Sequence, residues 1–259
     1  MISGWIDTHT HLEMLEGLPE DAIKDAESHG VSQFITIGTH PEDNKRVLEI
    51  AKKYFPRVAC TLGLHPHEAK HYTDEVEKEM ESHFSEPCVV GIGEIGLDYY
   101  YNHSPREVQL EVFRKQMRLA EKSGLAIQIH TRDAEDDTIA ILKEFEGRVR
   151  GMFHCFTGTR RLAEEGLKLG YNISFSGIIT FKTAEDLREV VKMVPLDRMH
   201  VETDAPFLAP VPMRGKKNVP SYIVHTAKKI AELKGVSESE LSQRLTENTR
   251  KLFPKLKPV

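Results

Sequence analysis

Residues 89–96 read VVGIGEIG, residues 105–123 read PREVQLEVFRKQMRLAEKS, and residues 125–132 read LAIQIHTR. The outer two runs are short and apolar with β-branched residues, which is typical of buried strands. The middle run spaces its apolar residues along one face of a helix and stops before Gly124, a residue type that favours helix ends. The three runs therefore predict a strand, a helix and a second strand parallel to the first.

The same alternation of strand and helix runs through the whole chain. Six more apolar runs are predicted strands, at residues 5–11, 34–39, 58–65, 151–156, 171–177 and 199–206. Helical patterns lie at 19–28, 41–54, 133–145, 159–169 and 183–193, and two more fall within 220–253. Eight strands in 259 residues predict an α/β fold, the (β/α)8 TIM-type barrel, as a single domain over residues 1–259. The alternative, a doubly wound sheet, ordinarily has a glycine-rich loop after its first strand, where this chain has HTHLEML.

Composition narrows the class of protein. The chain is 39% hydrophobic and 29% charged, as globular proteins are, and its net charge of −5 argues against coating nucleic acid by bulk electrostatics. We see neither a secretory signal nor an apolar run of the roughly 20 residues that span a bilayer. Cys60, Cys88 and Cys155 share no CxxC spacing, so they fit small core residues in a reducing compartment. We expect a cytoplasmic protein without membrane association or an obligate protein partner.

Ligand-type side chains follow five of the predicted strands. In such barrels the active site gathers at the C-terminal ends of the strands. Imidazoles and carboxylates together suit divalent metals, and six of them exceed the three protein ligands of a usual mononuclear zinc site. The sequence therefore predicts two divalent ions per chain, with Mg, Mn and Zn not distinguished. The predicted ligands are His9, His11, Glu94, His130, His154 and Asp204.

Eight short motifs carry a resemblance to a known family. They are DTHTHL (7–12), GLHPHEA (63–69), GEIGLDYY (93–100), IHTRDA (129–134), HCFTG (154–158), FSGIITFK (175–182), ETDAPFLAP (202–210) and RGKKNVP (214–220). Together they resemble the TatD family of metal-dependent deoxyribonucleases, within the amidohydrolase-like barrels. Departures fall at Thr10 and Gln128, where we would expect Cys and an apolar residue, and neither is a ligand.

The resemblance implies a hydrolase that cleaves DNA phosphodiester bonds, as a 3′-end exodeoxyribonuclease acting on a single strand or a 3′ end through a metal-activated water. It implies that one metal is held by His9, His11, Glu94 and Asp204. The second metal would be held by Glu94, His130 and His154, so that Glu94 is shared.

Further residues have predicted roles around the metals. Asp204, Glu202 and His65 are the predicted catalytic residues, with Asp204 handling the water, Glu202 supporting a ligating His and His65 meeting a phosphate oxygen or the leaving group. The predicted substrate contacts are His65, Asp98, Arg132 and Lys182, and MRGKKN (213–218) is a candidate contact to a nucleic-acid backbone.

Two other functions fit the same sequence. A barrel of this kind could hydrolyse another ester, an amide or a lactone. Many such barrels bridge their metals with a carbamylated lysine, whereas this chain has Glu94 on the fourth strand, which favours phosphoesters. The second alternative is a metal-binding or nucleic-acid-binding module without catalysis, which would bind metal without turnover.

Overall fold

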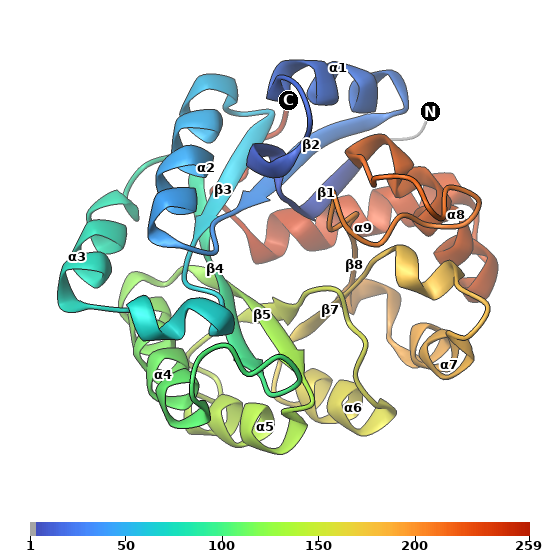
Figure 1. Ribbon diagram of the computed structural model, residues 1–259. Helices are drawn as coiled ribbons and strands as arrows, with labels where there is room; N and C mark the ends of the chain where they lie inside the picture. The colour runs from blue at the N-terminus through green and yellow to red at the C-terminus, as the bar shows by residue number, and fades with distance from the viewer. Residues whose placement is uncertain (1–3) are drawn as a thin grey trace.

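The computed structural model describes residues 4–259, and residues 1–3 of the predicted domain lie outside the described residues. Eight parallel strands form one sheet in the order β1 to β8, curled into a nearly closed barrel (Figure 1). This confirms the predicted (β/α)8 fold. The strands are β1 (Trp5–Thr10), β2 (Val31–Ile37), β3 (Val58–Leu62), β4 (Val89–Asp98), β5 (Ala126–Arg132), β6 (Gly151–Phe153), β7 (Asn172–Phe175) and β8 (Met199–Val201).

Helices surround the barrel in chain order, as Figure 1 shows. Their starts and ends follow local signals: α2 begins with Pro41, has Glu42 and Asp43 in its first turn, and ends in two lysines, as the helix dipole favours. The helices are α1 (Pro19–Ser28), α2 (Pro41–Tyr54), α3 (Asp74–His83), α4 (Arg106–Ser123), α5 (Glu135–Glu144), α6 (Arg160–Lys168), α7 (Glu185–Met193), α8 (Ile223–Lys234) and α9 (Glu238–Leu252). Short 3-10 turns occur at η1 (Leu12–Met14), η2 (Pro66–His71), η3 (Gly177–Thr180), η4 (Leu196–Arg198) and η5 (Pro220–Tyr222).

The sequence patterns misplaced some strand ends and missed one helix. Strand β8 ends at Val201, whereas its apolar run predicts a strand to residue 206. Residues 202–205 are as buried as a strand, but they belong to the loop that follows β8. Helix α3, at 74–83, was not among the predicted helices. It buries only Met80, so no repeating apolar face marks it in the sequence.

The seam between β8 and β1 is closed by hydrogen bonds from the loop that follows β8. The amide of Asp204 donates to the His9 carbonyl at 2.9 Å, and the amide of His11 donates to the Ala205 carbonyl at 2.8 Å. The Thr8 hydroxyl donates to the Val201 carbonyl at 3.0 Å. These bonds fix the loop after β8 against β1, and so bring Asp204 next to the two histidines of the first strand.

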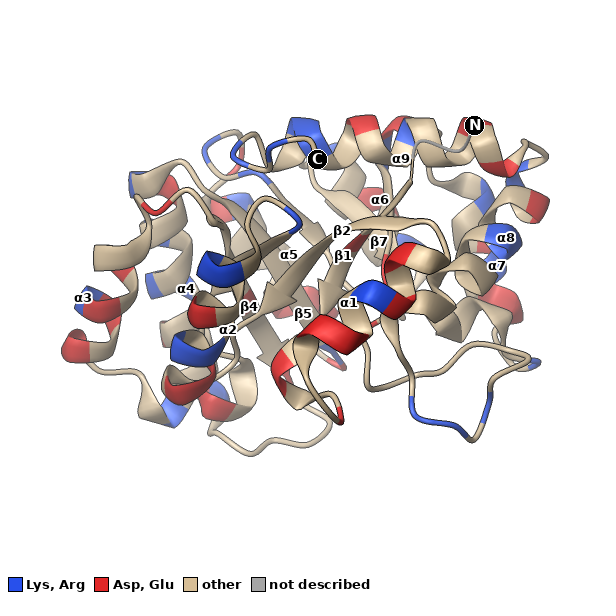
Figure 2. Cartoon of the chain, turned by 90° about the horizontal axis from the view of Figure 1, so that it is seen from above, with Lys and Arg blue, Asp and Glu red and all other residues tan. Residues whose placement is uncertain are grey.

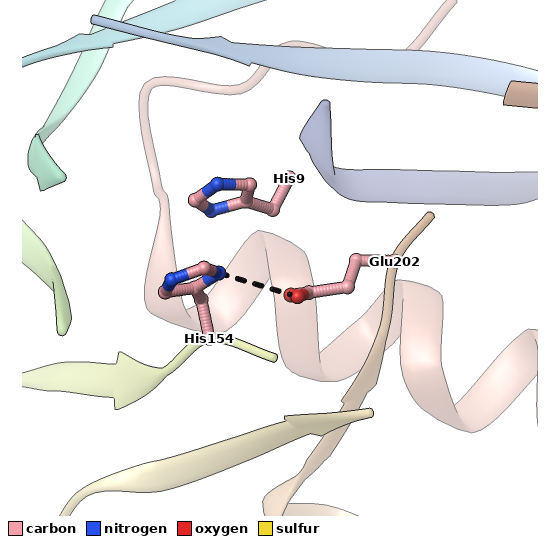
Figure 3. Close-up of side chains that lie close together, drawn as sticks. All are labelled: His9, His154 and Glu202. Carbon is pink, nitrogen blue, oxygen red and sulfur yellow. Dashed lines mark ion pairs between the residues drawn. The ribbon is translucent and has the colours of Figure 1, made fainter. Parts of the chain in front are cut away.

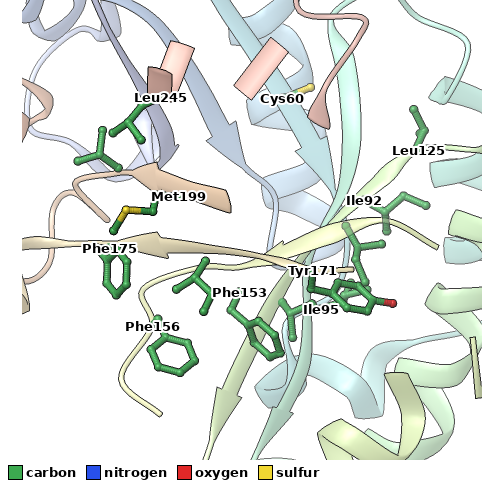
Figure 4. Close-up of a cluster of buried hydrophobic side chains, with 14 of the residues drawn as sticks. Cys60, Ile92, Ile95, Leu125, Phe153, Phe156, Tyr171, Phe175, Met199 and Leu245 are labelled. Carbon is green, nitrogen blue, oxygen red and sulfur yellow. The ribbon is translucent and has the colours of Figure 1, made fainter. Parts of the chain in front are cut away.

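The apolar core has two parts, because alternate strand residues face opposite sides of the barrel wall. Ile127 and Ile129 of β5 face outward into the layer beneath the helices, part of which Figure 4 shows. Ala126 faces inward, into a cluster at the bottom of the barrel with Phe253, which is fully buried. Burying a side chain of that size contributes about 1.5–3 kcal/mol. By the same alternation Gln128 and His130 face the barrel interior, nearer the C-terminal ends of the strands.

The surface carries both signs of charge. In Figure 2 basic and acidic segments alternate along the outer helices, so this view shows no single basic face. Within residues 4–259 no helix combines the length and the apolar character needed to cross a membrane. Cys60, Cys88 and Cys155 are free thiols.

Candidate metal centre

Six side chains from distant parts of the chain meet at the C-terminal mouth of the barrel. His9 lies in β1 and His11 directly after it, Glu94 lies in β4, and His130 lies in β5. His154 follows the end of β6 by one residue, and Asp204 follows the end of β8 by three. The structure therefore brings together all six residues that the sequence predicts as ligands.

Glu94 stands between two groups of imidazoles. Its Oε1 lies 2.7 Å from His154 Nε2 and 2.9 Å from His130 Nδ1. Its Oε2 lies 3.4 Å from His9 Nε2. Each carboxylate oxygen thus belongs to a different group, which is the arrangement that a bridging carboxylate requires.

The second group is formed by Asp204 with the histidines of the first strand. Asp204 Oδ1 lies 3.5 Å from His11 Nε2 and 3.7 Å from His9 Nε2. Asp204 has a φ of 55°, in the left-handed region that residues other than glycine rarely adopt. The buried amide of Asn218 holds this loop, because its Nδ2 donates to the carbonyls of Thr203 at 2.8 Å and Phe207 at 2.5 Å.

Three of these imidazoles have a carboxylate near the nitrogen that faces away from the centre. His130 Nε2 lies 3.0 Å from Asp98 Oδ2, and His11 Nδ1 lies 3.4 Å from Glu13 Oε1. His154 Nδ1 lies 3.4 Å from Glu202 Oε1, the contact drawn in Figure 3, where the His154 ring stacks on that of His9. Such outer partners orient ligating histidines and fix their tautomers.

The buried carboxylates shift the pKa values of the histidines. Burial opposes the charged imidazolium, but hydrogen bonds with Asp204 and Glu13 raise the pKa of His11 to about 10. Burial also opposes the charge on His154, yet Glu94 and Glu202 hold its pKa well above the usual value. Burial alone would raise the pKa of Glu94, but the charge of His154 and hydrogen bonds from His130 and His154 hold it well below its usual range. The centre therefore carries concentrated negative charge that protons or cations neutralise.

The residues present fit a divalent cation. Among the described residues His9 Nε2 is buried and has no hydrogen-bond partner, although it faces Glu94 and Asp204. An unpaired buried nitrogen is costly unless it is ligated. Neutral imidazole nitrogens and carboxylate oxygens are the donors that zinc, iron and manganese take in proteins.

His65 joins the centre, whereas Glu202 lies behind it. His65 Nδ1 accepts the amide of His67 at 3.1 Å, so the proton of the neutral ring lies on Nε2, 3.3 Å from Glu94 Oε1. Burial lowers the pKa of His65 to about 4, which keeps the ring neutral.

Glu202 is fully buried, and its Oε1 accepts the amide of Cys155 at 2.6 Å. Its position suits the orientation of His154 and not a contact with substrate.

The predicted substrate contacts fall in different surroundings. Asp98 is fully buried, and its Oδ1 accepts the amides of Tyr100 at 3.0 Å and Tyr101 at 2.9 Å while Oδ2 faces His130. These contacts orient the loop after β4 and the ring of His130. Arg132 is exposed, with its guanidinium 4.0 Å from the centre of the Tyr100 ring. Lys182 is exposed two residues beyond η3.

Sequence reasoning missed three residues that support the centre: Glu13, Gln128 and Asn218. Each acts through a contact with a residue far away in the chain or across a turn, and such contacts have no local pattern. The motif RGKKNVP contains Asn218, but this segment was predicted to contact nucleic acid through its basic residues. Lys217 instead forms an ion pair with Glu16 on the surface.

A further cluster of ligand-type residues lies on the rim, at His40, Glu68 and His71. His40 Nδ1 accepts the amide of Glu42 at 3.3 Å, as a helix cap. The proton of the neutral ring therefore lies on Nε2, which removes that nitrogen as a ligand while the cap persists.

Comparison with known proteins agrees with this geometry. The family described as TatD related DNase matches residues 6–254. The chain is 42% identical to an uncharacterized metal-dependent hydrolase of Bacillus subtilis, YabD, over 95% of this chain and 98% of the relative. It is 33% identical to the 3′-5′ ssDNA/RNA exonuclease TatD of Pectobacterium carotovorum, over 90% of this chain and 92% of the relative.

A solved structure gives the same result. The crystal structure of YjjV, a TatD homologue from Escherichia coli, superposes with a TM-score of 0.91 at 30% identity, covering 98% of this chain and 99% of that chain. Fold and sequence thus agree over almost the whole length. This chain belongs to the TatD family of metal-dependent hydrolases.

Proposed function

We propose that this protein hydrolyses phosphodiester bonds of DNA, as an exonuclease acting at a 3′ end, with two divalent cations held at the barrel mouth. The observation that carries the proposal is the position of Glu94. Its two oxygens face different imidazoles: Oε1 faces His130 and His154, and Oε2 faces His9. Two cations close together clamp the attacking and leaving oxygens of a phosphoryl group, which suits phosphodiester cleavage.

The residues divide into two sets around the shared carboxylate. His9, His11 and Asp204 would hold one cation, and His130 and His154 the other, with Glu94 common to both. Bound divalent cations supply Lewis acidity, which makes water easier to deprotonate and offsets charge on the phosphoryl oxygens.

Asp204 and His65 are the residues we assign to the reacting groups. The Asp204 side chain is 12% exposed, against 5% for Glu94 and 0% for Glu202, so it is the carboxylate most open to the mouth. We therefore assign to Asp204 the acceptance of the proton from the attacking water. Because His65 Nδ1 accepts the amide of His67, its neutral ring carries a proton on Nε2, and we assign to this Nε2–H a hydrogen bond to a phosphoryl oxygen.

Exposed aromatic side chains at the mouth support a nucleic-acid substrate. Tyr100 and Tyr101, after β4, are 58% and 51% exposed. Phe207, after β8, is 50% exposed and lies edge-on to His11, with ring centres 6.0 Å apart. Bases stack on such rings, and a guanidinium such as that of Arg132 pairs with phosphate. Unpaired bases are the ones free to stack, which favours a single strand or a frayed end, as does the name of the relative from Pectobacterium.

The experiment combines metal analysis with DNA degradation. We expect the purified protein to bind two divalent ions per chain and to shorten a 5′-labelled single strand from its 3′ end, with a chelator abolishing the reaction. Glu94→Gln should lose at least about 100-fold in rate, since loss of an outer partner alone typically costs about 10- to 100-fold. The matched control is Glu68→Gln, on the rim, which should retain the rate.

The substrate class is tested in the same assay. The protein is incubated with an amide and a lactone panel beside the DNA. Turnover of panel compounds without any DNA shortening would overturn the proposal in favour of another hydrolase reaction. Binding of cations without turnover of any substrate would overturn it in favour of a non-catalytic binding protein.

A further inference from the structure

Gln128, a fully buried residue of β5, reaches across the interior of the barrel to β1. Its Oε1 lies 2.7 Å from His9 Nδ1, and its Nε2 lies 3.0 Å from the Thr8 carbonyl oxygen. The two contacts are made with consecutive residues of β1. They engage both ends of the amide, so the side chain has one orientation.

The orientation of this amide determines the tautomer of His9. A carbonyl oxygen cannot donate, so the amide group of Gln128 that faces Thr8 is the NH2. The atom that faces His9 is therefore the oxygen, which only accepts. His9 Nδ1 must then carry the proton, and the lone pair of the neutral ring lies on Nε2. This is the nitrogen that faces Glu94 Oε2 and Asp204 Oδ1.

The neighbouring strand leaves room for this side chain. A Cβ atom built on Gly93 of β4 would lie 2.9 Å from Gln128 Cβ, closer than such atoms approach in proteins. The glycine before Glu94 thus allows β4 and β5 to place Glu94 and Gln128 around the same imidazole.

Gln128 also differs from the other outer partners in charge. His11, His130 and His154 face Glu13, Asp98 and Glu202, all carboxylates. His9 alone among the four faces a neutral amide. The amide fixes the tautomer without adding a charge to an interior that already holds several acids.

We propose that Gln128 is a positioning residue for one half of the metal centre: it holds His9 as the Nδ1–H tautomer, with Nε2 presented to the cation shared with His11 and Asp204. This rests on the proposed two-cation function. The family resemblance leads us to expect an apolar residue at position 128, where this chain has glutamine.

The direct test reads the tautomer of His9 in the metal-free wild-type protein. Long-range proton–nitrogen NMR correlations distinguish Nδ1–H from Nε2–H in neutral imidazoles, and His9→Gln assigns the signals. We expect Nδ1–H for His9. In Gln128→Met, which keeps the side-chain length but removes the acceptor, we expect a mixture of tautomers. An Nε2–H tautomer in the wild-type protein would overturn the inference.

The second test measures cation affinity by titrating metal-free protein with Co²⁺ or Zn²⁺ against a competing chelator. Gln128→Met should weaken one of two binding steps by about 10- to 100-fold, as loss of an outer partner does. Gln128→Glu, which can still accept from His9, should recover part of the loss. The matched control is Gln33→Met, since Gln33 is equally buried but donates to the carbonyls of Pro56 and Lys257, away from the centre.

The outcomes separate this inference from the proposed function. Equal affinities in wild-type and Gln128→Met protein would overturn the role of Gln128 and leave the two-cation proposal standing. A wild-type protein that binds one cation or none would overturn the two-cation proposal, while the NMR spectrum still decides whether Gln128 sets the tautomer of His9.

Discussion

At the scale of single residues, Asp98 shows how a buried carboxylate acts through its neighbours. One oxygen accepts two backbone amides of the loop after β4, and the other faces His130 Nε2 at 3.0 Å. Burial favours the neutral acid, but hydrogen bonds from His130 and from the Tyr101 amide hold the pKa of Asp98 below its usual range. With a cation held at His130 Nδ1, the charged Asp98 carboxylate would accept the remaining ring proton, on Nε2.

Asp98→Asn should therefore disable His130 without unfolding the loop. The Asn oxygen keeps the two backbone amides, so its NH2 must face His130 Nε2, and the proton of the neutral ring moves to Nδ1. We expect cation affinity to fall by about 10- to 100-fold, with little change in the KM for DNA, measured by metal titration and steady-state kinetics. The control is Asp137→Asn. Asp137 lies in α5, where its carboxylate accepts a hydrogen bond from the Tyr99 hydroxyl. A raised KM at unchanged cation affinity would instead make Asp98 the substrate contact that the sequence predicts.

At the scale of elements, His200 of β8 links that strand to β7 and α9. Its Nε2 accepts from the Asn172 amide at 2.9 Å, since the Asn172 oxygen is taken by Arg198. Its Nδ1 donates to the Thr249 hydroxyl at 3.1 Å. A second proton on the ring would face the Asn172 NH2, and burial together with the charge of Arg198 lowers the pKa of His200 to about 3.

This pKa makes the packing of β8 sensitive to acid. Between about pH 3 and the ordinary histidine value of 6.5, the unfolded chain binds a proton that the folded chain does not. Stability from His200 is therefore complete above pH 6.5 and falls as the pH drops, by about 2 kcal/mol between pH 7 and pH 5. Urea unfolding with chelator present measures the free energy of unfolding of the wild-type and His200→Gln proteins. Between pH 7 and pH 5 this free energy should fall by about 2 kcal/mol less in the variant than in the wild-type protein. Parallel curves for the two proteins would contradict this.

The elements also show what the sequence can predict. Helices α1 and α2 begin and end where the patterns place them, because Pro at the start and acids in the first turn are local signals. The six ligand-type residues are recognisable because strand ends of a barrel share one rim. Gln128, by contrast, is defined by contacts with Thr8 and His9, more than a hundred residues away. No local pattern contains that distance, so Gln128 was not predicted as a support, whereas Glu202, two residues before Asp204, was predicted to support a ligating histidine.

At the scale of the whole molecule, the metal centre exists only when the barrel is complete. Its proposed ligands lie in β1, β4 and β5 or shortly after β1, β6 and β8, so the unfolded chain does not hold them together. Without cations, the buried carboxylates Glu94 and Asp204 also lower the stability of the folded chain, because burial of charge opposes folding unless that charge is neutralised. Cations that bind only the folded chain stabilise it by mass action.

Removal of the cations should therefore lower the melting temperature. At a cation concentration about a hundredfold above the Kd, one site adds about 2.7 kcal/mol, which corresponds to roughly 5–10 °C in a protein of this size. Calorimetry of the wild-type protein with cation and with excess chelator measures this difference. In Glu94→Gln protein, which lacks the carboxylate common to both groups, the difference should shrink, whereas Glu68→Gln should keep it. Identical melting temperatures with and without chelator in the wild-type protein would mean that the carboxylates and imidazoles of the mouth are satisfied by one another alone.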